Sequence, residues 1–100
     1  MAAKENQLLS DFIGFEYQQP EPNDSILFDY RNNPIQFERD WNLLMGVWDK
    51  FRDLKFNEET KSKLHTNYVA RLAQDLAYGT ILEFFNNVQI AIKWYNINKM

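Results

Sequence analysis

Few side chains in this sequence have both the type and the spacing that chemistry at a site requires. His65 is the single histidine and the chain has no cysteine, so the Cys and His sets that hold zinc cannot be assembled. None of the three serines (Ser10, Ser25 and Ser62) has a histidine in a suitable context to activate it as a nucleophile. His65 lies in a polar stretch and is expected at the surface. The sequence therefore predicts no catalytic residue, no bound metal and no cofactor.

Acidic residues offer the other route to chemistry. Four of them gather in one segment: Glu16, Glu21, Asp24 and Asp29. Ca²⁺ and Mg²⁺ prefer such oxygen ligands, but the spacing fits no EF-hand loop and the glycine expected inside one is missing. Asp40 and Asp49 form the remaining candidate acid pair, and their positions favour the solvated edge of a helix. Three widely separated glycines cannot form a phosphate-binding loop.

Composition places the chain among soluble globular proteins. Its 100 residues are the size of one domain, with 45% hydrophobic, 25% charged and 16% aromatic residues. The net charge is −3 and no basic stripe stands out, which disfavours DNA or RNA binding. No apolar run approaches the ~20 residues of a membrane span, and the first residues lack the apolar segment of a signal peptide. We therefore expect a single domain over residues 1–100, without membrane contact, in the cytoplasm.

The N-terminal third predicts one short helix and an irregular connector. Apolar residues within 5–13 fall on one side of a helix, and Gly14 provides a stop because glycine enters the left-handed conformation at little cost. Residues 15–33 carry prolines and turn formers and read as a connector. Within it, the apolar run 26–30 is bounded by turn residues and favours a strand. Residues 14–17 are its nearest pairing candidate in a small hairpin; the alternative is an extended segment lying over the helices.

A long central helix is predicted over residues 34–55. Asn33 can cap it, Pro34 suits the first helical position, and Gln36 can reach back as in a capping box. Apolar side chains then recur at spacings of four, three, four and three: Phe37, Trp41, Leu44, Trp48 and Phe51. Gly46 lies in the middle of this helix and could mark a kink or a close approach of another helix.

Two further helices are predicted over residues 58–78 and 80–97. Asn57 can cap the first of them, although a strand within 64–72 is the alternative there because apolar and polar residues alternate. Gly79 ends that helix and Thr80 caps the last one. The fold class expected is mainly α, with α+β as the variant if the hairpin near 14–30 forms.

The last helix has more apolar residues than one face can hold. Most share a stripe about a third of the circumference wide, but Ile90 and Trp94 stack on the side away from it, and Leu82 lies on a third azimuth. Either the N-terminal segment or the strand at 26–30 covers Ile90 and Trp94, or another subunit or a host protein buries them. Tryptophan is a preferred anchor at such interfaces, and burying both would contribute on the order of 3–6 kcal/mol gross.

Three pieces of the chain, covering about half of it, resemble a family of small hypothetical proteins common in phages and mobile elements of Bacteroidota-type bacteria. The pieces are an N-terminal "QLLSDFIGF", the pattern Trp-x-x-Leu-Met within "WNLLMGVWDKF" (41–51), and "GTILEFFNNVQIAIKWYN" (79–96), which closes with Lys93, Trp94, Tyr95 and Asn96. The chain departs from the pattern at Gly46, where proline is expected, and 56–78 matches nothing in the family. The resemblance implies a phage or mobile-element source and a small, mostly helical or α+β fold, but no activity.

Two functions are compatible with these observations. The first is a non-catalytic accessory protein that binds a protein partner or self-associates through Leu82, Ile90 and Trp94, in the host cytoplasm if a phage encodes it. The alternative is an oligomer that binds a small ligand, a nucleotide signal of host defence, between aromatic side chains and three arginines: Arg31, Arg39 and Arg71. A small enzyme is a third reading, and would require polar residues clustered in a pocket.

Overall fold

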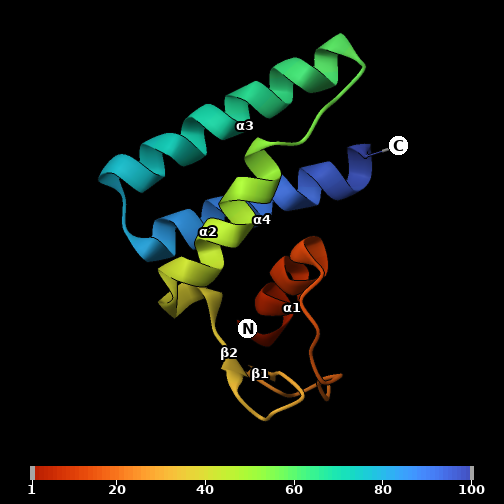
Figure 1. The fold of residues 1–100 in the computed structure, drawn as a ribbon, viewed down its shortest axis with the longest axis vertical. Helices are drawn as coiled ribbons and strands as arrows, with labels where there is room; N and C mark the ends of the chain where they lie inside the picture. Colours follow the sequence, from red (N-terminus) through yellow and green to blue (C-terminus); the bar gives the residue numbers. More distant parts are fainter. Residues whose placement is uncertain (1, 100) are drawn as a thin grey trace.

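A computed structural model describes residues 2–99 of the chain. Four helices, a short hairpin and one 3₁₀ turn follow one another: α1 (Ala2–Ile13), β1 (Leu27–Phe28), β2 (Pro34–Ile35), η1 (Phe37–Arg39), α2 (Trp41–Arg52), α3 (Glu59–Tyr78) and α4 (Ile81–Asn98). Helix α2 crosses in front of α4 in Figure 1, α3 runs beside α4, and the hairpin lies at the end of the molecule away from α3. The expected mainly helical class, with a short N-terminal helix and a small hairpin, is confirmed.

Helix α4 is the centre of the core, because α1, η1, α2 and α3 all pack against it. The fully buried side chains come from every one of these elements: Leu9, Phe37, Leu44, Val47, Phe51, Leu72, Phe84, Phe85, Val88, Ala91 and Ile92. Those of α4 belong to the single apolar stripe visible in the sequence. Burial of such large aromatic and aliphatic groups supplies most of the free energy that holds the helices together.

Helix α1 ends where the sequence predicts. Gly14 adopts a positive φ of 75°, the left-handed conformation that terminates helices, and the backbone N–H of Phe15 closes the end on the carbonyl of Ser10 at 2.8 Å. Beyond it, the Tyr17 hydroxyl donates to Asp11 (2.7 Å) and accepts from Gln7 (3.1 Å), which fastens the connector to α1. Burial, together with the hydrogen bond to Asp11, raises the pKa of Tyr17 above its ordinary value.

The hairpin pairs β1 with β2, not with residues 14–17 as the sequence suggested. Leu27 lies opposite Ile35 in an antiparallel ladder. Gln18, just after the segment 14–17, donates to the hairpin from its backbone N–H to the Phe28 carbonyl (2.8 Å) and from its side chain to the Asp29 carbonyl and the side chain of Asn32. The turn depends on Asp29, whose Oδ1 accepts from the backbone N–H groups of Arg31 and Asn33. Chiefly through the Asn33 hydrogen bond, the pKa of Asp29 is held below its ordinary value.

The helix predicted over 34–55 begins instead at Trp41, so the predicted start is wrong. Pro34 belongs to β2, and Asp40 is the true cap, because its carboxylate accepts from the backbone N–H groups of Asn42 and Leu43. A tertiary contact fixes the segment before it. Asn6 of α1 is 1% exposed, accepts from the backbone N–H of Phe37 (2.9 Å) and donates to Glu38 (3.0 Å). These bonds hold residues 36–39 as a separate turn against α1.

Residues 59–78 form a continuous helix, which excludes the alternative strand within 64–72. Glu58 occupies the cap position of α3 without a side-chain hydrogen bond, so Asn57 is not the cap that the sequence suggested. At the other end Gly79 terminates α3, and a Cβ there would lie 2.8 Å from the carbonyl oxygen of Asp75. Thr80 caps α4 by accepting from the backbone N–H of Glu83, as predicted.

Replacing Gly46 by alanine should stabilise the protein. Gly46 is exposed in the interior of α2, and an added Cβ would meet nothing within 4 Å, so no other helix approaches it closely. Alanine is favoured over glycine inside a helix, and we expect the free energy of unfolding to rise by about 0.5–1 kcal/mol in urea denaturation. The matched control is Gly14→Ala, which should destabilise because Gly14 has a positive φ. A loss of stability in Gly46→Ala would contradict this account.

Candidate functional site

The back of α4 carries a stripe of exposed apolar residues, interrupted by the exposed polar residues Asn86 and Lys93. Leu82, Ile90 and Ile97 are 55%, 54% and 82% exposed. At about 100° per residue they lie within roughly 80° of one another and opposite the buried stripe of the same helix. Ile97 was not singled out from the sequence, although the same helical geometry would have found it. The structure therefore groups Leu82 with Ile90, on one side of α4.

Trp94 does not belong to this stripe, because its ring packs against aromatic residues of the same chain. Its ring is half-buried, with its centroid 5.3 Å from that of Phe56 and 5.2 Å from that of Tyr68. Phe56 lies in the segment between α2 and α3, so neither the N-terminal segment nor the strand near 26–30 provides the aromatic cover that the sequence suggested. Trp94 joins the last helix to α3, while Ile90 remains exposed.

Helix α3 extends the stripe into a broader face. Leu64 is 41% exposed, and together with Asn67, Tyr68 and Arg71 it lines a shallow groove of about 150 Å³. Tyr68 and Arg71 also border Ile90 of α4, so the two helices share one surface. We define the α3–α4 face by six residues: Leu64, Tyr68 and Arg71 of α3 with Leu82, Ile90 and Ile97 of α4.

The acidic and the basic residues in or beside the α3–α4 face lie at different positions along it. Asp75 and Glu83 lie near the turn that joins the helices, where Asp75 accepts from the side chain of Asn87 at 2.7 Å. Lys93 lies between Ile90 and Ile97, further from that turn, and it and Glu83 are the only charged residues between 81 and 98. Neither Arg71 nor Lys93 has an ion-pair partner among residues 2–99. The face is therefore acidic beside the α3–α4 turn and basic at Arg71 and Lys93, which lie further from the turn.

The three arginines proposed as anion contacts are not brought together within one chain. Arg31 lies in the hairpin turn, Arg39 in η1 and Arg71 in α3, and all three are exposed. The hairpin and α3 occupy opposite ends of the molecule in Figure 1. One small ligand cannot reach both, so the geometry of a single chain provides no anion site of this composition.

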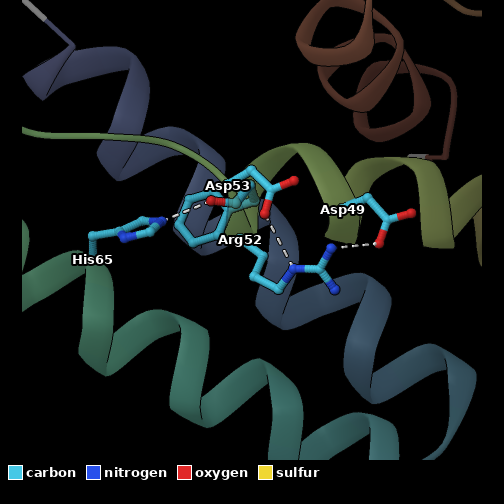
Figure 2. Close-up of polar contacts among 5 residues, drawn as sticks. Asp49, Arg52, Asp53 and His65 are labelled. Carbon is cyan, nitrogen blue, oxygen red and sulfur yellow. Dashed lines mark hydrogen bonds and ion pairs between the residues drawn. The ribbon is translucent and has the colours of Figure 1, made fainter.

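His65 is buried, which corrects the expectation that it lies at the surface. Figure 2 shows it reaching from α3 to the end of α2, where Nε2 lies 2.7 Å from the carbonyl oxygen of Phe51 and must donate to it. Its ring centroid is 5.0 Å from that of Phe51 and 5.2 Å from that of Phe56. The single histidine thus satisfies a carbonyl at the C-terminal end of α2 and has a structural role.

The carboxylates considered for chemistry have other partners. Asp40 caps α2, and Asp49 forms an ion pair with Arg52 at 3.3 Å (Figure 2). Within residues 2–99, no group of three or more His, Cys, Asp or Glu side chains is placed to hold a metal ion, the four acids of the connector included.

Over the same described part of the chain, none of the helices combines the length and the apolar character needed to cross a membrane. Comparison with protein-family models, with curated protein sequences and with solved structures gives no match to this chain.

Proposed function

We propose that the chain is a non-catalytic accessory protein of a phage or mobile element that acts by binding protein through the α3–α4 face. The observation that carries the proposal is the alignment of Leu82, Ile90 and Ile97, each more than half exposed, along one side of α4. Single exposed apolar residues are common on soluble proteins, but aligned groups mark contact surfaces. Full burial of an aliphatic side chain contributes about 1.5–3 kcal/mol, so covering this stripe would yield useful affinity.

The surface chemistry favours a protein partner over a small ligand. The groove beside Tyr68 and Arg71 is shallow, whereas sites for small molecules enclose most of the ligand surface. Exposed apolar side chains with a few charges among them, here Arg71 and Lys93, are typical of contacts between folded proteins. The proposed partner surface is therefore another helical face that is largely apolar.

The substitution Ile90→Glu tests the proposal. Because Ile90 is 54% exposed and glutamate is a good helix former, helicity and the free energy of unfolding should change by no more than about 0.5 kcal/mol. Any complex made through the face should weaken by at least about tenfold, since a charge would be buried in its apolar centre. The measurement is native mass spectrometry of the tagged chain purified from expressing cells, which gives the mass of any bound protein.

The matched control is Tyr30→Glu, because Tyr30 is 69% exposed in the hairpin turn, away from the face. It should leave the complex intact. If the wild-type chain carries no bound protein of defined mass, or if Ile90→Glu and Tyr30→Glu affect a complex equally, the proposed function is wrong.

A further inference from the structure

We infer that the partner of the α3–α4 face is a second copy of this chain, related by a two-fold axis that sets the two α4 helices antiparallel. This inference rests on the proposed function and names the partner. Three features of the face carry it: the balance of its charges, the separation of acidic from basic residues along it, and its size.

The first feature is that the face can meet itself without electrostatic repulsion. In a two-fold interface the same patch serves both subunits, so every group faces a copy of the same surface. Two basic residues, Arg71 and Lys93, and two acidic ones, Asp75 and Glu83, lie in or beside the face, whereas the chain as a whole carries −3. The face is thus neutral on an acidic protein, and its apolar centre suits a copy of itself.

Second, the position of the charges selects the orientation. Glu83 lies in the first turn of α4 and Lys93 ten residues, about 15 Å, further along the helix. If two copies met with their α4 helices parallel, Glu83 would lie near Glu83 of the partner subunit and the lysines would meet likewise. Antiparallel helices instead bring the acidic residues of one copy over the basic residues of the other, and the axis makes this contact occur twice. Opposite charges at distances below the ~8–10 Å Debye length still attract in physiological salt.

The third feature is size. Eighteen residues make α4 about 27 Å long at ~1.5 Å per residue. Two packed helices are roughly 20 Å wide, so the face measures on the order of 500 Å² in projection before the relief of its side chains is added. A standard stable interface buries about 800 Å² per partner. The α3–α4 face is therefore of the right order for a dimer.

The experiment is a charge-reversal cycle followed by sedimentation equilibrium from about 1 µM to about 1 mM protein. The wild-type chain should reach twice its mass of 12.0 kDa. Lys93→Glu and Glu83→Lys should each weaken the dimer by roughly 5- to 20-fold, because each replaces two attractions with two repulsions. The variant with both reversals should recover most of the wild-type affinity. Lys4→Glu, an equal charge change in α1, is the control and should have no effect.

The Glu83 carboxylate also accepts a hydrogen bond from the Thr80 hydroxyl at 3.3 Å, so Glu83→Lys could weaken the cap of α4. Thermal unfolding of each variant would detect such a loss of stability. Lys93→Glu does not touch the cap and provides the decisive single variant. Reversals that fail to compensate one another would overturn the antiparallel arrangement. A wild-type chain that stays monomeric up to ~1 mM would overturn the second copy as partner. If that monomer still carries a different protein that Ile90→Glu releases, the proposed function stands and only this inference fails.

Discussion

Asn6→Leu should lower the free energy of unfolding by about 2–4 kcal/mol, a large part of the 5–15 kcal/mol typical of a domain. Asn6 is 1% exposed and makes two hydrogen bonds, from the backbone N–H of Phe37 and to the carboxylate of Glu38. Leucine can replace neither, so the buried N–H of Phe37 would lose its partner, and an orphaned buried donor costs about 1–3 kcal/mol by itself. Urea denaturation followed by circular dichroism would measure the change.

A suitable control is Gln74→Leu, which makes the same kind of change at an exposed position of α3. It should alter stability by no more than about 0.5 kcal/mol. If Asn6→Leu lowers the free energy of unfolding by no more than the control does, the hydrogen bonds of Asn6 do not hold residues 36–39 in place.

Trp94→Ala should cost about 2–4 kcal/mol of stability. Truncation of a buried aromatic residue costs about 3–5 kcal/mol, and Trp94 is half-buried, which places the expected loss toward the lower end. The indole packs on Phe56 and Tyr68, so its removal would loosen the segment that joins α2 to α3 and weaken the contact between α3 and α4. Urea denaturation of Trp94→Ala, Phe56→Ala and the double variant should give a coupling energy of about 0.5–1.5 kcal/mol between the two rings.

Ile90→Glu, four residues away on the same helix, is the natural comparison because it should leave stability nearly unchanged. The two variants therefore distinguish a side chain packed within the chain from one on the proposed contact surface of α4. A Trp94→Ala variant that is as stable as the wild type but unable to associate would mean that the indole belongs to the binding surface. It would contradict the packing of Trp94 on Phe56 and Tyr68.

The helical content could be predicted because it depends on local periodicity. The apolar repeats of α2, α3 and α4 are long. Gly14 ends α1 and Thr80 caps α4 through contacts with residues no more than one helical turn away. The start of α2 could not be predicted, because the cap-like signature Asn33–Pro34–Gln36 is local. Contacts from elsewhere in the chain override it: Pro34 and Ile35 pair with β1, and Asn6 of α1 accepts from the backbone N–H of Phe37. In such cases a tertiary hydrogen bond outweighs a good local signal.

The candidate site was only partly predictable for the same reason. Helical geometry places Leu82 and Ile90 away from the buried stripe from sequence alone. It cannot say which outlying residue another element covers, and the cover of Trp94 comes from Phe56, a loop residue with no periodic neighbours. His65 was hidden likewise: it lies in a largely polar stretch, but the rings that enclose it, Phe51 and Phe56, precede it in the chain and meet it only after folding.

The two-residue link between α3 and α4 has a consequence for the order in which the protein assembles. Only Gly79 and Thr80 separate these helices, while residues 14–80 separate α1 from α4. Closing a short loop costs less entropy than closing a long one, so we expect the α3–α4 pair to form early in the folding reaction and α1 to dock late. Asn6→Leu, which removes the hydrogen bonds between α1 and the 3₁₀ turn, should then mainly increase the unfolding rate. Trp94→Ala, which removes a contact between α3 and α4, should mainly decrease the folding rate.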